Sequence, residues 1–296
     1  MTGRSEAAAS SSPLEGVEAA GRSAVDHVDV TEPRPWHYGV VAKWFAEFNT
    51  EGPEIAYIQT YVEAGQPALD VACGTGRLLI PYLRAGLDVD GCDASSDMIA
   101  LCREQVERER FSPTLRVQPM NELDMPRRYR TVYVCGAFGI GGDRGDDEEA
   151  LRRIYQHLEP GGTLVLDNDV PYNDEHRWQY WTKEKRRELP EPWRGSSGGR
   201  RTGSDGVEYE VRGRIVEVDP LSQRVTLEGR GSIWRDGRLI EHDEHVSTST
   251  LYFTNELRLM LDRAGFTDIE LRGDYTDEEP TGDTEVVVFT ARKPQG

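Results

Sequence analysis

The apolar positions between residues 67 and 170 form short runs that alternate with segments of helical periodicity. Short apolar runs indicate buried strands, and apolar residues spaced three and four positions apart indicate helices. Strands that alternate with helices along a chain form a parallel sheet with helices on both faces. The pattern predicts strands over 68–72, 87–92, 115–118, 132–135 and 163–166, and helices over 77–85, from Ser95 or Ser96 through Val106, and over 146–158.

Downstream, the pattern changes to alternation of apolar and charged residues between Val207 and Ile233. Asp236-Gly237 then gives a strong signal for a two-residue hairpin before a further run over 239–253. We expect an antiparallel meander that is apolar on one face. That face needs a cover, which either the main domain or a second subunit would supply, so a homodimer is one of the two alternatives.

The last segment completes the first sheet. A helix is expected over 255–264 with Gly265 as its cap, followed by strands over 267–271 and 286–291. The sequence therefore predicts an α/β fold with a doubly wound, mostly parallel seven-stranded sheet. Residues 67–170 and 254–296 would form this domain, with an inserted antiparallel β subdomain over 171–253.

The N-terminal region precedes this domain and has two parts. Residues 1–30 are rich in Ala, Ser, Glu and Gly without apolar periodicity, which predicts a disordered tail. From Trp36 onward, aromatic and aliphatic residues recur at helical intervals, so residues 31–66 are expected to form one or two covering helices.

Composition limits the partners. The net charge of −18 argues against nucleic acid, and the mixed run over 183–187 is better explained as a solvated face. No apolar run approaches the ~20 residues needed to span a bilayer, and no secretory signal precedes the domain. Four cysteines without a CxxC spacing suit reduced thiols, so we expect a cytoplasmic protein with a small-molecule partner.

The strongest chemical signal is the turn Asp70-Val-Ala-Cys-Gly-Thr-Gly76, which follows the first predicted strand. In an open parallel sheet, ligands bind beyond the carboxyl ends of the strands. Gly74 and Gly76 allow a ligand to approach the backbone there, and Asp93, at the end of the second strand, suits the two hydroxyls of a ribose. A dinucleotide site would require a third glycine where Leu79 stands, which disfavours a nicotinamide-dependent oxidoreductase.

This turn, Asp93 and the stretch Leu158-Glu-Pro-Gly-Gly-Thr-Leu-Val165 resemble the class I S-adenosylmethionine-dependent methyltransferases. The resemblance implies a Rossmann-like fold and S-adenosylmethionine as cofactor. The inserted meander is similar to that of small-molecule members such as amino-sugar N-methyltransferases, where it contributes to the acceptor site or to dimer contacts. The cofactor-binding residues it implies are Tyr38, Asp70, Ala72, Gly74, Gly76, Asp93, Ala94, Met98, Met120, Asn121 and Cys135.

Individual contacts follow from the same resemblance. The methionine part would lie along Ala72, Gly74 and the Cys135 backbone, with Ala94 and Met98 near the adenine. Many relatives carry an acidic residue after the third strand for the adenine amino group. This chain has Pro119-Met120-Asn121 there, so Asn121 or a backbone carbonyl would have to substitute.

The acceptor site is expected beyond the fourth and fifth strands. The candidates for substrate binding are Phe138, Asn168 and Tyr172, and those for proton transfer are His176 and Asp169. Methyl transfer is an in-line displacement that depends mainly on holding the reactants in position, so no single catalytic base is assigned. A SAM-binding protein without activity is therefore the alternative to a methyltransferase acting on nitrogen or oxygen of a small polar metabolite.

Two groups of metal-ligand residue types stand in the sequence. Asp167-Asn168 resembles the ligand pair of magnesium-dependent catechol-type O-methyltransferases, but the fourth strand ends in Cys135-Gly-Ala without the acid those enzymes add. His242 and His245 would face opposite sides of a strand and are expected on the surface. We therefore expect no metal.

Overall fold

The computed structural model describes residues 37–193 and 199–296, which all belong to the second of two compact units, residues 33–296. The predicted tail over 1–30 and Trp36 lie outside the described residues. Within the part of the chain that is described, every helix is too short or too polar to cross a membrane.

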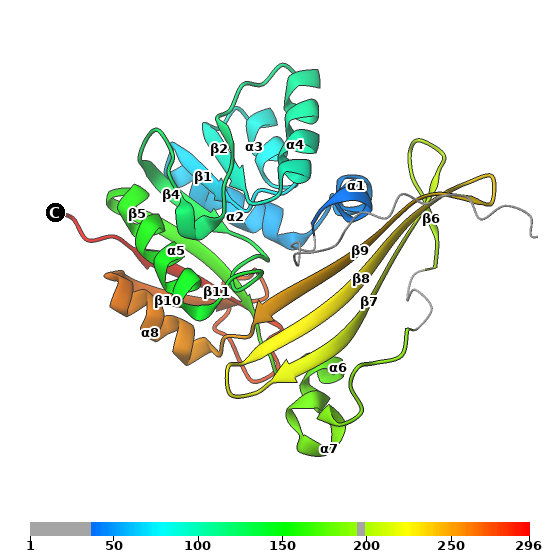
Figure 1. Cartoon of the computed structure of the whole chain (residues 1–296). Coiled ribbons are helices and arrows are strands. Elements are labelled where there is room, and N and C mark those ends of the chain that lie inside the picture. The colour runs from blue at the N-terminus through cyan, green and yellow to red at the C-terminus, as the bar shows by residue number, and fades with distance from the viewer. Residues whose placement is uncertain (1–36, 194–198) are drawn as a thin grey trace, which may run out of the picture. The chain divides into compact units, whose positions relative to one another are not determined.

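A seven-stranded sheet forms the centre of this unit (Figure 1). Its strand order is β10-β11-β5-β4-β1-β2-β3, and all pairs are parallel except those that involve β11. The predicted doubly wound, mostly parallel sheet is confirmed. Its strands are β1 (Ala68–Val71), β2 (Val89–Asp93), β3 (Leu115–Val117), β4 (Tyr129–Val134), β5 (Leu158–Asp169), β10 (Thr267–Gly273) and β11 (Val286–Arg292).

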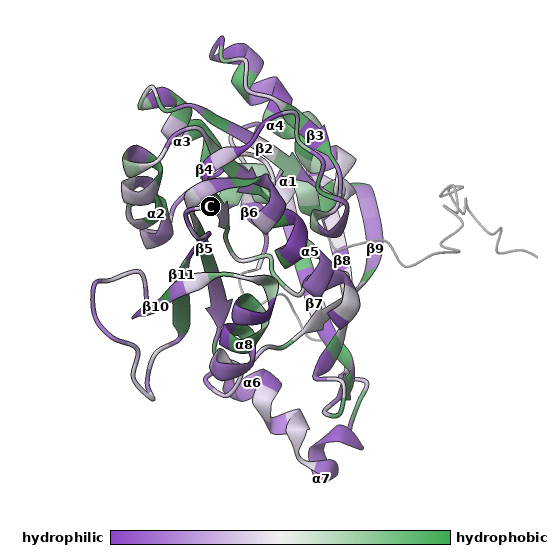
Figure 2. Cartoon of the chain, turned by 90° about the vertical axis from the view of Figure 1, so that its left-hand side faces the viewer, coloured by the Kyte–Doolittle hydropathy of each residue, from purple (hydrophilic) through white to green (hydrophobic). Residues whose placement is uncertain are grey.

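Helices cover both faces because successive strand residues point to opposite sides. Leu69 and Val71 belong to one hydrophobic core with α5 (Arg144–His157) and α8 (Thr254–Ala264). Ala68 belongs to the other, with α2, α3 and α4, and in Figure 2 α2 and α5 lie on opposite sides of β5. The helices of this second face are α2 (Pro53–Ala64), α3 (Leu79–Arg84) and α4 (Ser96–Arg108).

Several boundaries differ from the prediction, among them the start of one helix and the end of another. The helix expected from Arg77 begins at Leu79, since residues 74–78 form turns that leave the backbone open above β1. The helix expected through Leu158 ends at His157, and β5 begins at Leu158. Pro160 explains this early end, because a proline disfavours helical geometry in the residue before it.

The second sheet is antiparallel, with order β6-β7-β8-β9. Asp236 and Gly237 both have positive φ, as the predicted hairpin between β8 and β9 requires. Between β5 and this sheet the chain forms short helices that the alternating pattern did not predict. The short helices are α6 (Glu175–Trp178), η2 (Gln179–Trp181) and α7 (Lys183–Arg186). The strands of the antiparallel sheet are β6 (Arg201–Thr202), β7 (Glu208–Asp219), β8 (Arg224–Arg235) and β9 (Arg238–Thr250).

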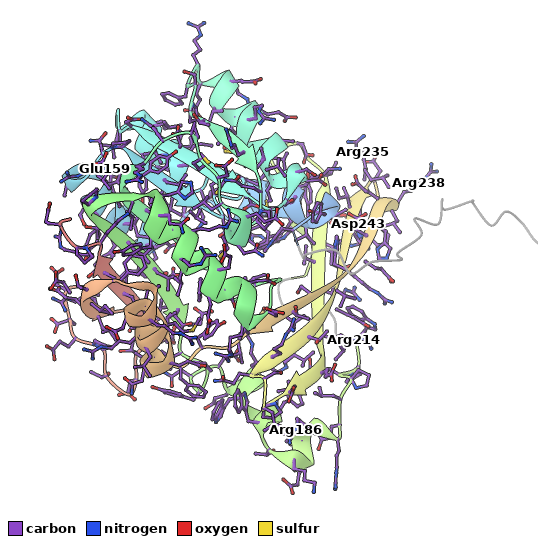
Figure 3. All side chains as sticks on the ribbon, turned by 60° about the vertical axis from the view of Figure 1, so that its left-hand side comes forward. Glu159, Arg186, Arg214, Arg235, Arg238 and Asp243 are labelled. Carbon is purple, nitrogen blue, oxygen red and sulfur yellow. The ribbon has the colours of Figure 1, made fainter. Side chains whose placement is uncertain are left out.

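Helix α1 (Gly39–Phe48) covers part of the antiparallel sheet and joins it to α4. The backbone nitrogen of Gly39 donates to Asp97 of α4 (2.8 Å), and that of Val40 donates to Asp243 of β9 (2.6 Å), which Figure 3 labels beside α1. Gly231 of β8 admits Val40, because a Cβ there would lie 2.7 Å from the valine Cβ. Within this unit, α1 therefore supplies some of the cover that the apolar face needs.

Candidate functional site

A cavity of about 390 Å³ opens beyond the carboxyl ends of β1, β2 and β4. This volume lies within the usual range for small-molecule sites, about 300–1,000 Å³. The cavity brings together nine of the eleven residues that the sequence assigned to the cofactor. They are Asp70, Ala72, Gly74, Asp93, Ala94, Met98, Met120, Asn121 and Cys135.

The backbone after β1 turns sharply at the floor of the cavity. Ala72 and Gly74 both have left-handed φ angles, +64° and +55°. A Cβ added to Gly74 would meet no protein atom within 4 Å, so the space beside it is available to a ligand. Left-handed geometry is costly for a residue with a side chain, and a strained Ala72 at this position is typical of a functional turn.

Gly76 has a different role, since it does not line the cavity. A Cβ there would approach Ile80 Cδ1 to 2.7 Å and Cys102 Sγ to 3.0 Å. The structure therefore requires this glycine for packing between the turn and the helices beneath it. Tyr38 also lies outside the lining, and its hydroxyl is 3.4 Å from the carbonyl oxygen of Ala94 at the edge.

Asp93 joins the turn to the end of β2. Its Oδ2 accepts a hydrogen bond from the Gly74 nitrogen (2.9 Å), and its Oδ1 accepts one from the Ser95 nitrogen (2.7 Å). Burial raises the pKa of Asp93, while these two hydrogen bonds oppose that rise. Each carboxylate oxygen retains a lone pair that a ligand hydroxyl could use. Burial also raises the pKa of Asp70, which precedes the turn in β1.

The residues after β3 form another wall. Asn121 Nδ2 donates to Asp146 Oδ1 of α5 (2.8 Å), which leaves the asparagine oxygen without a partner among the described residues. Gln118 was not predicted but also lines the cavity, and its buried Nε2 has no nitrogen or oxygen partner among them. The Asn121 oxygen and Gln118 Nε2 are thus available to bind the amino group or a ring nitrogen of a ligand. Pro119, between them in the sequence, has no polar side-chain group for this purpose.

Arg77 is a lining residue that the sequence analysis missed. Its guanidinium forms an ion pair with Glu54 of α2 and lies 3.7 Å from Cys135 Sγ. Both charged side chains are largely buried, 16% and 10% exposed. Because Arg77 directly follows the glycine turn, the sequence could have indicated that it lines the site. Its ion pair could not be predicted, because Glu54 of α2 is remote in the sequence.

Helix α1 and residues on either side of it form the cover. His37, Phe45 and Asn49 line the cavity from this side. Ser95 Oγ donates to the His37 carbonyl oxygen (2.5 Å), which ties the cover to the loop after β2. Burial, with His245 nearby, lowers the pKa of His37 to about 4, so its imidazole is neutral near pH 7.

A further wall of the cavity comes from residues 140–142 and the first turn of α5. The nitrogen of Gly141 donates to the Thr248 carbonyl of β9 (2.8 Å), which attaches this wall to the antiparallel sheet. Asp147 lines the cavity here, and Tyr252, just after β9, donates a 2.6 Å hydrogen bond to its Oδ2. Neither Asp147 nor Tyr252 was predicted, because the contact joins residues 105 positions apart.

The five residues predicted for the acceptor do not line this cavity. Phe138 is buried against Tyr252, Asn168 Nδ2 donates to the Tyr252 carbonyl (2.9 Å), and the side chain of His176 is paired with buried Glu191 (2.7 Å). Asp169 is exposed at the end of β5, and Tyr172 is 41% exposed beside Trp178. Phe138 and Asn168 contact a residue that is distant in the sequence, and the sequence pattern could not predict such contacts.

The residue types considered for metal binding are held in other contacts. Among residues 37–193 and 199–296, no group of three or more His, Cys, Asp or Glu side chains could hold a metal ion. Asp167 accepts hydrogen bonds from the Gly136 nitrogen (2.6 Å) and the Tyr275 hydroxyl (2.5 Å). His242 is partly exposed, but the prediction that His245 lies on the surface is wrong, because it is 5% exposed.

Comparison with known proteins agrees with this geometry. Residues 68–162 match the family of methyltransferase domains. A protein of Geobacillus sp. (strain WCH70) that carries the name methyltransferase is 27% identical, with 86% of this chain and 99% of that protein covered. The dTDP-3-amino-3,4,6-trideoxy-α-D-glucopyranose N,N-dimethyltransferase of Streptomyces venezuelae is 25% identical, with 87% and 95% covered.

A solved structure extends the likeness to the fold. The sugar N-methyltransferase KedS8 from Streptoalloteichus sp. superposes with a TM-score of 0.66 at 20% identity, covering 94% of this chain and 100% of that one. The strand order, the glycine turn and the matched domain agree with one another. Residues 68–162 thus match a methyltransferase domain, and the chain has the class I fold of the S-adenosylmethionine-dependent methyltransferases.

Proposed function

We propose that this protein transfers the methyl group of S-adenosylmethionine to a nitrogen or oxygen atom of a small polar metabolite. One observation carries the proposal: Gly74 and Asp93 are hydrogen-bonded to each other at a cavity that nine of the predicted cofactor residues line. The free space beside Gly74 suits a ligand that lies against the backbone.

The residues present fit this cofactor along its length. Asp93 would accept hydrogen bonds from the ribose hydroxyls, and Met98 and Met120 would pack on the adenine. Arg77 would attract the carboxylate of the methionine part, which would lie along Ala72 and Gly74. When bound, the cofactor supplies a methyl group that its sulfonium makes electrophilic.

The protein's own contribution is to hold the acceptor in line and keep water out. Such positioning contributes roughly 7–11 kcal/mol in favourable cases. Helix α1 contributes Phe45 to the lining of the cavity, and Ile140 forms an apolar part of another wall. The acceptor would bind between these surfaces.

The class of acceptor rests on charge and on the relatives. A net charge of −18 disfavours nucleic acid, and the Streptomyces and Streptoalloteichus relatives are named as sugar N-methyltransferases. Free cysteines in the described chain suit the cytoplasm, where we place the protein.

The oxidoreductase alternative is weakened by Leu79. This side chain is fully buried, and a Cβ on Gly91 would lie 2.7 Å from its Cδ1. A dinucleotide site would instead need a glycine there, so that the helix could pack closely beside a pyrophosphate.

Transfer of label tests the proposal and separates it from a silent SAM-binding protein. The protein would be incubated with methyl-labelled S-adenosylmethionine and a panel of small amines, amino sugars, hydroxy acids and phenols. We expect label to appear in one class of acceptor, together with an equal amount of S-adenosylhomocysteine. Binding of the cofactor without transfer to any of the classes would contradict the enzymatic part of the proposal.

A further inference from the structure

The lining of the cavity carries more acidic than basic groups. Among the described lining residues, Asp70, Asp93, Asp146 and Asp147 are acidic, whereas Arg77 is the basic one apart from neutral His37. The charge of Arg77 is already matched by Glu54. A cavity of this kind favours a cationic guest over an anionic one.

Three of these four carboxylates belong to the part of the cavity assigned to the cofactor. Asp70 is buried in β1, and Asp93 binds the Gly74 and Ser95 nitrogens. Asp146 uses both oxygens, since Oδ1 accepts from Asn121 and Oδ2 from the Asp143 nitrogen (3.1 Å). Asp147 accepts a hydrogen bond from the Tyr252 hydroxyl at Oδ2, while its Oδ1 has no hydrogen-bond partner among the described residues.

Asp147 also points to a different part of the protein from the residues assigned to the adenine. Consecutive residues of a helix are turned by about 100°, so neighbouring side chains point in different directions. Asp146 points to Asn121, at the predicted adenine end, whereas Asp147 points to Tyr252, where the chain leaves the antiparallel sheet. At this junction the Thr250 nitrogen also donates to the Gly139 carbonyl (2.7 Å), so the loop after β4 contacts the antiparallel sheet beside the partner of Asp147.

We propose that the methyl acceptor is an amine and that Asp147 binds its ammonium group and removes a proton from it. This inference rests on the proposed function and assigns its acceptor class. Tyr252 is a positioning residue, which fixes one carboxylate oxygen and leaves the other toward the cavity.

The proton and electron balance is simple. An ammonium nitrogen transfers one proton to Asp147 Oδ1 and keeps the electron pair. That pair forms the new bond to the methyl carbon, and the pair of the broken carbon–sulfur bond stays on sulfur, which becomes a neutral thioether. The methylated ammonium leaves, and Asp147 then releases its proton to water.

The surroundings of Asp147 suit a base that works near neutral pH. Burial raises its pKa to about 6, opposed by the Tyr252 hydrogen bond. Of the charged neighbours at the start of α5, Asp146 and the N-cap residue Asp143 raise this pKa and Arg144 lowers it.

Two ligands test the inference without the unknown acceptor. S-adenosylhomocysteine lacks the transferred group, whereas sinefungin carries a primary ammonium in place of the methylsulfonium. Titration calorimetry on the full chain would give both affinities between pH 5 and 8. For the wild type we expect the preference for sinefungin to rise about tenfold or more across this range, as Asp147 ionises.

Two variants sharpen the result. Asp147→Asn should lose about tenfold or more of the sinefungin affinity at pH 7.5 and bind S-adenosylhomocysteine within about twofold of the wild type. Tyr252→Phe keeps the carboxylate but removes the bond that lowers its pKa, so the preference should survive with its midpoint at higher pH.

The outcomes are separable. A wild-type preference that does not change with pH, or the same preference in Asp147→Asn, would overturn the role of Asp147. If Asp147→Asn does not fold, the pH dependence of the wild-type preference for sinefungin is the deciding result. Failure of both ligands to bind the wild type would overturn the proposed function itself.

Discussion

The backbone nitrogen of Gly74 donates a 2.9 Å hydrogen bond to Asp93 Oδ2, which joins the ends of two neighbouring parallel strands. The bond holds the turn open on one side and orients the carboxylate on the other. A mononucleotide-like ligand needs both features at once, a bare backbone and an acceptor for ribose hydroxyls. The relationship therefore links the local sequence of the turn to the proposed cofactor.

The two glycines of the turn should respond differently to substitution. Gly74→Val places a branched side chain in the free space and should abolish detectable binding of S-adenosylhomocysteine, at a backbone cost of about 1–2 kcal/mol. Gly76→Ala, the matched control, should instead lower the stability of the free protein, because its Cβ meets Ile80 and Cys102. Chemical denaturation and calorimetric titration of both variants would check this. Retained affinity in Gly74→Val would place the ligand elsewhere.

The buried pair of Arg77 and Glu54 should show strong non-additivity. Arg77→Met leaves the glutamate uncompensated and should cost about 3–5 kcal/mol of stability. Adding Glu54→Gln should recover most of that loss, because no buried charge then remains. Cofactor affinity should stay low in the double variant if Arg77 also binds the methionine carboxylate. Urea denaturation and calorimetry would measure the two effects, and wild-type affinity in the double variant would refute that contact.

Asp147 should oppose stability at neutral pH. Its pKa of about 6 in the folded protein lies above the unfolded value of about 3.9, so the folded state binds the proton more tightly. Stability from this group is fully present below about pH 3.9 and is lost as the pH rises through 6. Asp147→Asn should therefore stabilise the free protein by about 1–3 kcal/mol at pH 7.5 and by much less near pH 4. Equal effects at both pH values would argue against the shifted pKa.

His176 should prove structural. Its Nε2 lies 2.7 Å from Glu191, outside the cavity, so His176→Ala should cost about 1 kcal/mol and leave S-adenosylhomocysteine affinity within about twofold. Glu191→Ala should cost about 3 kcal/mol, because Tyr180 and the Ile215 nitrogen also lose their buried acceptor. Thermal unfolding of the two variants would rank them. A large loss of affinity in His176→Ala would restore this histidine to the site.

Local patterns were sufficient to predict the sheet and many of the residues that line the cavity. The turn from Asp70 to Gly76 and the carboxylate of Asp93 are each specified by a few adjacent residues that end a strand. Periodicity also showed that residues near Trp44 form a helix, although not that His37 and Phe45 reach the cavity. Gly76 shows the limit, since only the positions of Ile80 and Cys102 reveal that packing requires it.

The acceptor side could not be predicted in this way. Asp147 lies in the first turn of α5, where acidic residues are common because they interact favourably with the helix dipole. Its contact with Tyr252 joins residues 105 positions apart. Phe138 and Asn168 follow the expected strands, but both contact Tyr252 and neither lines the cavity. A one-sequence pattern contains no signal for such contacts, because they form only when the two sheets meet.

Calorimetric titration of the wild-type chain with S-adenosylhomocysteine, and separately with NAD, tests the central claim most directly. We predict saturable binding of S-adenosylhomocysteine at one site per chain and none of NAD. At a hundredfold excess over its dissociation constant, the ligand should stabilise the fold by about 2.7 kcal/mol. Binding of NAD with no response to S-adenosylhomocysteine would contradict the assignment of this cavity.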